Sequence, residues 1–341
     1  MRIAVDVSPL ALPRTGIGTY VRGMLSGLLE ASGGSHEVVA FSVTSVGGSR
    51  RIAAQLDGLP VELRARSLPL ARVWRSAWSR LGRPGVERLV GPVDVLHLSD
   101  WMQPPQRAGV RATTIYDLGP LHFPDWTHPR TRRLHEESFR HAARACDVLF
   151  AISEFTRRDA AETLGIEQNR LRVAYPGVDA AFSPEGEKAE RERPYVLAVA
   201  SDEPRKNLGV LAAALKLLPE LELVVAGPGS ALGHVGEQEL ARLYRGAAAF
   251  AFPSRFEGFG LPVVEAMASG TPVVSSSHPS LDEASGDAAL RADPDDPEAF
   301  AGALERALAE REALVERGLA HAARFTWRAT GEALVAGYAN A

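Results

Sequence analysis

The sequence predicts an α/β protein with two domains, each built on a parallel sheet. Short apolar runs alternate with helical patterns along most of the chain, and the alternation restarts after a charged break. The length of 341 residues suits two domains of roughly 150–180 residues. The composition, 45% hydrophobic and 23% charged, is that of a globular protein and excludes a disordered chain, a collagen or a coiled coil.

The first half begins with a strand and then alternates strands with helices. The expected strands are 3–7, 38–43, 93–98, 113–115, 148–152 and 171–174, and the clearest helices are 17–30 and 130–145. Because parallel strands need crossover connections, this alternation predicts a parallel sheet covered by helices. The charged stretch 185–193 (EGEKAERER) lacks an apolar face and is predicted to be a linker, which places the N-terminal domain at 1–184.

The second half repeats the alternation from residue 194 to residue 325. Strands are expected at 195–200, 221–226, 248–252 and 272–275, and helices at 208–217, 239–245, 260–269, 297–311 and 312–323. A last helix is expected at 328–338, with Thr326 as its N-cap. Two Rossmann-like domains with a cleft between them are therefore predicted.

Charge and cysteine content exclude several classes of protein. The 38 basic and 42 acidic residues give a net charge of −4, which argues against a nucleic-acid binder. Residues 1–180 hold 23 Arg and 18 acidic residues, so this half either faces an anionic partner or reflects drift on a solvated surface. The single cysteine, Cys146, excludes an internal disulfide framework, and no Cys/His spacing predicts a zinc site.

The start of the chain and its apolar runs indicate a protein of the cytoplasm. No apolar run approaches the roughly 18 residues that span a bilayer. The first residues, MRIAVDV, are interpreted as a buried strand and not as a signal peptide.

The segment 255–274 (RFEGFGLPVVEAMASGTPVV) carries the richest motif. It follows an expected strand, at the edge where open α/β sheets bind ligands. Gly258 and Gly260 allow backbone N–H groups to turn toward a ligand, and the helix that follows offers its positive end. Glu257 lies in the loop and Glu265 inside the helix, so the two carboxylates can contact different parts of one ligand.

This segment strongly resembles the E-x7-E motif of the GT-B retaining glycosyltransferases of family 4. Five further stretches resemble motifs of that family in the same order, namely 16–20 (GIGTY), 152–159 (ISEFTRRD), 176–179 (PGVD), 204–207 (PRKN) and 227–229 (GPG). The resemblance covers nearly the whole chain. It implies that segment 326–341 crosses back to the N-terminal domain.

The resemblance also implies transfer of a sugar from a nucleotide-sugar to an acceptor hydroxyl with retained configuration and without a metal or cofactor. Arg205 and Lys206 would hold the diphosphate, and Glu265 would bind the ribose. Glu257 would hold the sugar. The backbone around Glu257 and the glycine loops would approach the donor. The further donor-binding residues that the resemblance implies are Gly16, Gly18, Ser201, Gly227, Gly258, Phe259, Gly260 and Leu261. The expected mechanism is front-face attack, with the diphosphate taking the acceptor's proton.

Two positions depart from the family pattern. Tyr116 stands where many relatives have His, which leaves Asp117 as a catalytic candidate and His97 and His122 as alternative ligand contacts or structural donors. Ser201 stands where many relatives have an Arg that binds diphosphate. Arg205 could replace that cation or lie in solvent.

The donor domain also looks shortened after Gly229. Only about ten residues separate strand 221–226 from the next helix, where relatives insert one more helix and strand. Residues 231–235 are interpreted as the remnant of that strand. The shortening leaves the wall of the nucleotide-base pocket undefined.

The segment 68–88 mixes two Trp residues with five Arg residues. It either lies on an anionic membrane surface near a lipid-linked acceptor or packs its Trp residues, Trp74 and Trp78, on the core of the N-terminal domain. The core alternative is favoured, because an apolar helix face usually means core.

The function predicted from sequence is glycosyl transfer in polysaccharide or glycolipid assembly. GDP-mannose is the favoured donor, a UDP-sugar is open, and the acceptor is a glycan or glycolipid. Two alternatives are a nucleotide-sugar 2-epimerase of the same fold and a non-catalytic sugar-binding module. The sequence indicates no oligomeric state.

Overall fold

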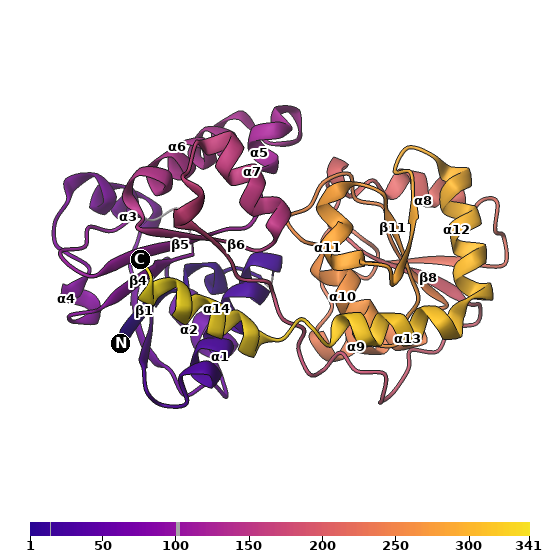
Figure 1. Ribbon diagram of the computed structural model, residues 1–341, viewed down its shortest axis with the longest axis horizontal. Helices are drawn as coiled ribbons and strands as arrows, with labels where there is room; N and C mark the ends of the chain where they lie inside the picture. The colour runs from indigo at the N-terminus through magenta and orange to yellow at the C-terminus, as the bar shows by residue number, and fades with distance from the viewer. Residues whose placement is uncertain (14, 100–102) are drawn as a thin grey trace. The chain divides into compact units, whose positions relative to one another are not determined.

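The computed structural model describes residues 1–13, 15–99 and 103–341, with only the backbone described at 72, 76 and 80. The chain forms two compact units (Figure 1). Unit 1 comprises Met1–Gly177 and Thr326–Ala341, and unit 2 comprises Val178–Phe325. The C-terminal segment therefore returns to unit 1, as the GT-B resemblance implied.

The first boundary differs from the predicted one. Residues 178–184, predicted to end the N-terminal domain, and the predicted linker 185–193 both belong to unit 2. The buried guanidinium of Arg245 donates hydrogen bonds to carbonyl oxygens of Ala181, Ser183 and Glu187. These bonds fix the segment 181–187 to unit 2. The polar composition of the segment does not reveal them, because they are made by its backbone carbonyl groups.

Unit 1 is built on a seven-stranded parallel sheet in the order β3-β2-β1-β4-β5-β6-β7. The strands are β1 (Arg2–Asp6), β2 (Glu37–Thr44), β3 (Glu62–Ser67), β4 (Val95–Leu98), β5 (Val110–Ile115), β6 (Val148–Ala151) and β7 (Leu171–Val173). The helices are α1 (Gly16–Ser32), α2 (Gly48–Gln55), α3 (Ala71–Leu81), α4 (Glu87–Val90), α5 (Gly119–His122), α6 (Pro129–Ala145), α7 (Glu154–Leu164) and α14 (Trp327–Ala339). The central strands are buried on both faces, which explains their continuous apolar runs.

Helix α14 packs directly on helix α1, as the yellow and indigo ribbons show (Figure 1). Glycine makes this contact possible, since a Cβ at Gly27 would lie 1.9 Å from the carbonyl oxygen of Trp327. At Gly331 a Cβ would lie 2.0 Å from the carbonyl oxygen of Gly27. The two backbones therefore approach closely only because both positions lack a side chain.

Unit 2 is built on a five-stranded parallel sheet in the order β12-β11-β10-β8-β9. The strands are β8 (Tyr195–Val199), β9 (Glu222–Ala226), β10 (Ala249–Phe252), β11 (Val273–Ser276) and β12 (Ala289–Ala292). The helices are α8 (Leu208–Ala214), α9 (Glu237–Gly246), α10 (Leu261–Ala268), α11 (Asp282–Ser285), α12 (Pro297–Ala309) and α13 (Arg311–Ala322). The α/β class with two parallel sheets is thus confirmed.

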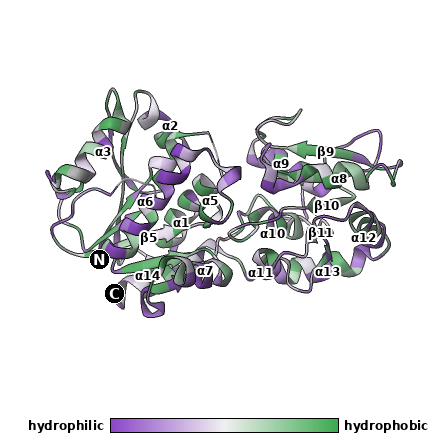
Figure 2. Cartoon of the chain, turned by 90° about the horizontal axis from the view of Figure 1, so that it is seen from above, coloured by the Kyte–Doolittle hydropathy of each residue, from purple (hydrophilic) through white to green (hydrophobic). Residues whose placement is uncertain are grey.

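The shortened segment after β9 forms turns. Residues 231–235 contain no strand, so their interpretation as a strand remnant was wrong. The backbone N–H of Gly227 donates to the carbonyl oxygen of Gly233, which closes a compact loop too tight for a strand. Strand β9, an apolar strand drawn in green (Figure 2), is consequently the last strand of its sheet.

Candidate active site

The candidate site lies in unit 2, where three neighbouring strands end. Strands β10, β8 and β9 are adjacent and parallel, so the loops that follow them meet at one edge of the sheet. These loops carry Glu257 after β10, Arg205 and Lys206 after β8, and Gly227 after β9. Open α/β sheets bind ligands at this edge.

Glu257 is held between the two predicted cations. Its Oε1 lies 2.7 Å from Nζ of Lys206, and its Oε2 lies 2.9 Å from Nη1 of Arg205. Arg205 also places its Nε 2.8 Å from Oε2 of Glu203. The ammonium of Lys206 lies 5.3 Å from the ring centroid of Phe252, so an aromatic face supports this charge.

These charges keep the Glu257 carboxylate ionised. Burial by itself would raise the pKa of Glu257, but the Lys206 ammonium and then the Arg205 guanidinium outweigh burial and lower that pKa. Burial likewise opposes ionisation of Glu203, yet Arg205 lowers the pKa of Glu203 overall. Two cations and two carboxylates therefore balance one another at the site.

The loops are tied together by bonds that sequence motifs did not reveal. The side chain of Asn207 donates to the carbonyl oxygens of Pro253 and Pro294, 3.2 and 2.6 Å away, from a residue with φ of +54°. The backbone N–H of Glu257 donates to Oγ of Ser280 over 3.0 Å. Glu203 and Ser280 were missed in the sequence, since neither lies in a motif that was singled out.

The start of helix α10 presents backbone to the site. Gly260 has φ of +104°, and a Cβ there would lie 2.6 Å from Cδ2 of Leu281, so only glycine fits. The Phe259 side chain is buried with its ring centroid 5.1 Å from that of Phe325. Gly258 has no side chain, and Leu261 begins the helix. Contacts of this turn to a ligand would therefore be made by backbone N–H groups and the positive helix end.

Glu265 is placed differently from Glu257. It lies within α10, is 7% exposed, and accepts a hydrogen bond of 3.2 Å from the Tyr244 hydroxyl. Burial and the neighbouring Glu265 carboxylate raise the pKa of Tyr244, so the phenol stays protonated as a donor. The ribose contact implied by the family resemblance remains a prediction.

Ser201 and Gly227 lie in adjoining loops beside the cations. The Ser201 hydroxyl donates to Glu203, the residue that also binds Arg205. Gly227 has φ of +138°, and a Cβ there would lie 2.2 Å from the carbonyl oxygen of Ala200. The structure thus links Ser201 to Arg205 through Glu203 and packs Gly227 against Ala200, the residue before Ser201.

The remaining predicted residues belong to unit 1. Gly16 and Gly18 lie in the first turn of α1, where the side chain of Thr15 accepts a hydrogen bond from the Gly18 N–H. A Cβ at Gly16 would meet no atom within 4 Å, and one at Gly18 would make ordinary contacts of 3.7 Å or more. Packing within unit 1 therefore does not require glycine at either position.

Asp117 lies at the end of β5 and lines a pocket of about 100 Å³, with Ile17 and His135 among the other lining residues. Its Oδ1 accepts a hydrogen bond of 2.9 Å from the Gly119 N–H, so one oxygen helps to form the start of α5. The ring of Tyr116 stands edge-on to that of Tyr20 with centroids 5.5 Å apart.

The two alternative histidines differ in their surroundings. His97 is fully buried, with Nδ1 2.7 Å from the Tyr338 hydroxyl and Nε2 2.9 Å from Oγ1 of Thr114. His97 is therefore a structural residue of the core, and the alternative that it contacts a ligand was wrong. His122 lies 2.7 Å from Oδ1 of Asp159, an ion pair when the imidazole is protonated.

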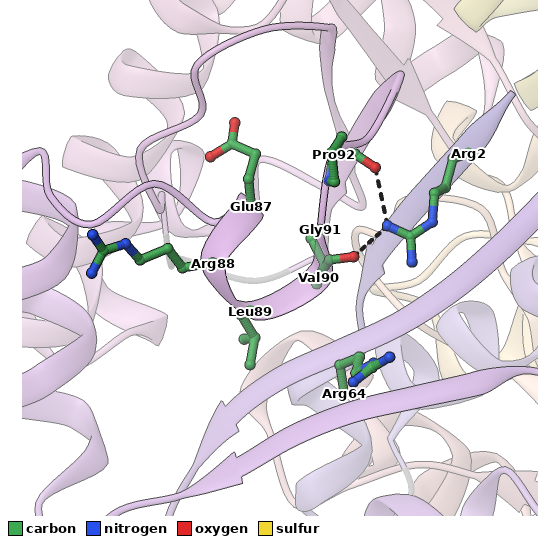
Figure 3. A pocket seen from close by; sticks show the side chains of 8 residues that line it. All are labelled: Arg2, Arg64, Glu87, Arg88, Leu89, Val90, Gly91 and Pro92. Atoms are coloured by element: carbon green, nitrogen blue, oxygen red, sulfur yellow. Dashed lines mark hydrogen bonds between the residues drawn. The ribbon is translucent and has the colours of Figure 1, made fainter.

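A second hollow in unit 1 lies at the opposite edge of its sheet, where β1 begins (Figure 3). The guanidinium of Arg2 donates to the carbonyl oxygens of Val90 and Pro92 and pairs with Glu37. Arg2 therefore fixes the turn after α4 to β1. This edge is opposite the ligand-binding edge of a parallel sheet.

Neither a metal site nor a membrane span is found in the part of the chain that the structure describes. Over residues 1–13, 15–99 and 103–341, no three His, Cys, Asp or Glu side chains group to hold a metal ion. Within the same ranges, no helix is long and apolar enough to cross a bilayer.

Two parallel-sheet α/β units, each covered by helices, form the GT-B fold that solved glycosyltransferase structures share. Family models agree with this class. The model described as Glycosyltransferase Family 4 matches residues 14–182, and the model described as Glycosyl transferases group 1 matches residues 193–310. The chain belongs to the family 4, group 1, glycosyltransferases.

Individual relatives give the same picture. The O-antigen chain mannosyltransferase B of Escherichia coli is 28% identical over 379 aligned positions, which cover 96% of each chain. The D-inositol 3-phosphate glycosyltransferase of Mycolicibacterium vanbaalenii is 31% identical over 58% of this chain and 54% of its own. The structure of HepE from Anabaena in complex with UDP-glucose superposes with a TM-score of 0.71, 15% identity and full coverage of both chains.

Proposed function

We propose that this protein is a retaining hexosyltransferase that moves a sugar, with mannose favoured, from a nucleotide-sugar to a hydroxyl of a glycan or glycolipid. The observation that carries the proposal is the convergence of Arg205 and Lys206 on Glu257, beside the start of α10. A diphosphate leaving group needs positive charge as its bond to the sugar breaks. A guanidinium fork, an ammonium and a helix N-terminus supply it together.

The proposed roles follow the chemistry of each group. Arg205 and Lys206 hold the two phosphates, and the backbone N–H groups at 258–261 face the donor. Glu257 contacts the sugar once its cations are engaged by phosphate, and Glu265 binds the ribose. Attack of the acceptor on the face that the diphosphate leaves retains the configuration, with a diphosphate oxygen taking the proton of the acceptor hydroxyl.

The similarity to an O-antigen mannosyltransferase supports mannose as the sugar. The segment 204–207 (PRKN) favours GDP-mannose as the donor. A UDP-sugar is the second candidate, because the similar HepE structure contains UDP-glucose.

Donor binding and turnover test the proposal in two steps. Melting temperatures are measured with GDP, UDP, GDP-mannose and UDP-glucose, and the donor that binds the folded protein raises the melting temperature. Diphosphate release and the anomeric configuration of the product are then followed by NMR with a polysaccharide or glycolipid acceptor. Conversion of the free nucleotide-sugar at its C2 without transfer would indicate the epimerase, and binding without any turnover would indicate a sugar-binding module.

The Lys206→Ala variant tests the cation assignment. Loss of one charge-assisted contact should weaken binding of the nucleoside diphosphate by about 1.5–3 kcal/mol, measured by calorimetry. Lys216→Ala is the matched control, since Lys216 is exposed in the same unit and follows α8. Unchanged binding in folded Lys206→Ala would overturn the assignment.

A further inference from the structure

Helix α3 exposes an unusual amount of apolar surface. Ten large apolar side chains are strongly exposed among the described residues, and four of them belong to this short segment. Leu70, Val73, Trp74 and Leu81 are 76%, 62%, 60% and 74% exposed. The spacing of Val73, Trp74 and Leu81 places these three on one side of the helix, and Leu70 directly precedes it. We call these four residues the α3 apolar stripe.

The adjoining side of the same helix packs on the sheet. Trp78 and Leu68 contact the buried cluster that includes Phe41 and Leu96, and the Trp78 indole N–H donates to the carbonyl oxygen of Pro84. The preference for core packing is thus correct for Trp78 and wrong for Trp74. The α3 apolar stripe is not required to close the core of unit 1.

The stripe lies in an arginine-rich segment. Residues 63–86 contain six Arg and no Asp or Glu. The exposed Arg83 follows α3, and the exposed Arg88 lies in α4. Residues 45–92 hold nine Arg and three acidic residues, whereas the rest of unit 1 holds fifteen of each. The excess positive charge of unit 1 is therefore concentrated in the segment 45–92, which contains α3 (Figure 2).

The backbone conformation of Leu70, at the start of the stripe, is one that leucine disfavours. Leu70 has φ of +54°, one of two non-glycine residues with positive φ in the described part of the chain. A leucine in this conformation is disfavoured, and such conflicts concentrate at functional sites. Leu70 is the N-cap residue directly before α3, and its fully apolar side chain lies in solvent there.

We propose that the α3 apolar stripe, with its flanking arginines, docks this protein on an anionic lipid bilayer. A bilayer surface offers apolar chains below a layer of phosphates, which matches an exposed apolar stripe next to guanidinium groups. Arginine binds phosphate through paired N–H groups, and a cluster of basic residues is drawn to anionic lipid. The contact is peripheral, with the stripe in the interfacial layer and the helix lying along the surface.

Vesicle binding of the full chain tests this docking. Sedimentation with vesicles of phosphatidylcholine alone and with equimolar phosphatidylglycerol measures the affinity for neutral and anionic surfaces. The wild type should bind the anionic vesicles at least tenfold more tightly, and high salt should reduce the difference. The triple variant Leu70→Ser, Val73→Ser, Trp74→Ser should lose at least tenfold of the affinity for anionic vesicles.

Two further variants separate apolar insertion from charge. Arg83→Gln with Arg88→Gln should reduce the preference for anionic lipid while leaving binding to neutral vesicles unchanged. The control replaces two exposed leucines elsewhere, Leu134→Ser and Leu217→Ser, and should bind like the wild type. An unchanged melting temperature in the triple variant shows that it is folded.

Three outcomes would overturn the proposal. They are absence of vesicle binding by the wild type, equal binding by the triple variant and the wild type, and a dimer in light scattering that the triple variant abolishes. The last result would assign the stripe to a second copy of the chain. None of these readouts depends on nucleotide binding, so the docking surface and the proposed transferase activity fail separately.

Discussion

At the scale of single residues, Glu257 is expected both to oppose binding of the diphosphate and to contact the sugar of the donor. In the free protein its carboxylate neutralises Arg205 and Lys206, the groups that a diphosphate would use. Glu203 takes part of the remaining charge of Arg205. A diphosphate must therefore displace Glu257 from its cations, and the displaced carboxylate becomes available to the sugar.

Glu257→Gln should accordingly bind nucleoside diphosphate more tightly and turn over more slowly. Removing the competing carboxylate should tighten binding about tenfold, since a charge-assisted contact no longer has to be broken. The kcat should fall, because the neutral Gln side chain stabilises the positive charge that develops on the sugar less well than a carboxylate does. Calorimetry with the diphosphate and steady-state kinetics measure the two effects.

The control for this variant is Glu310→Gln. It removes the same charge from an exposed pair with Arg306 at the end of α12, and it should leave diphosphate affinity unchanged. Equal tightening in both variants would mean that net charge alone is responsible. Full kcat in Glu257→Gln would refute its contact with the sugar.

Glu265→Gln should mainly raise the KM for the donor. A ribose contact made equally in the ground and transition states affects binding and not kcat. If Glu265 only braces Tyr244, the variant should lower the melting temperature without a selective effect on KM. Both quantities are measured on the same preparation.

At the scale of elements, helix α14 is a structural part of unit 1. His97 of β4 joins Thr114 of β5 to Tyr338 of α14 by hydrogen bonds within the core. Close backbone contact between α1 and α14 adds to this joint. The end of the chain therefore helps to hold the sheet that its beginning forms.

Gly27→Ala should destabilise unit 1 strongly. Its Cβ would lie 1.9 Å from the carbonyl oxygen of Trp327, so the two helices must separate, at a cost of about 1–3 kcal/mol or more. Gly302→Ala in α12 is the control, because a Cβ there meets no atom within 4 Å and alanine favours the helix. Urea unfolding of both variants checks the difference, and equal stability would contradict the close contact.

The His97 joint should weaken in mild acid. Burial lowers the pKa of His97 from 6.5 to about 3, so the folded protein keeps the imidazole neutral while the unfolded chain takes up a proton below pH 6.5. The stability that His97 supplies is therefore present above pH 6.5 and is lost as the pH falls toward 3, by about 1–1.5 kcal/mol at pH 5.5. Urea unfolding between pH 7 and 5.5 should show a smaller loss in His97→Gln than in the wild type, and equal losses would contradict this role.

The elements differ in how well the sequence predicts them. Buried strands such as β1, β2 and β10 each hold a continuous apolar run, and the sequence located them by it. Strand β3 (ELRARS) was missed, since an edge strand with a solvated face has no apolar run. The cations and Glu257 could be predicted because a motif holds them, whereas Ser280 reaches the site only through folding.

At the scale of the whole molecule, charge is divided between the two units. Unit 1 holds 24 Arg and 18 acidic residues, and unit 2 holds 14 basic and 24 acidic residues. The unit that we expect to bind an anionic donor is thus itself acidic. Long-range attraction cannot bring the donor there, so binding must depend on the local cations and on the start of α10.

This dependence predicts that transfer survives removal of divalent metal. A divalent ion at the diphosphate would need carboxylates facing it, but Glu203 is paired with Arg205 and the displaced Glu257 would contact the sugar. Arg205, Lys206 and the N-terminus of α10 would then stabilise the negative charge on the leaving diphosphate. Turnover in excess EDTA should equal that in added Mn²⁺, whereas Lys206→Ala should lose activity in both. A complete loss in EDTA that Mn²⁺ restores would mean that the side-chain cations are insufficient, and the assignment of the diphosphate to them would be wrong.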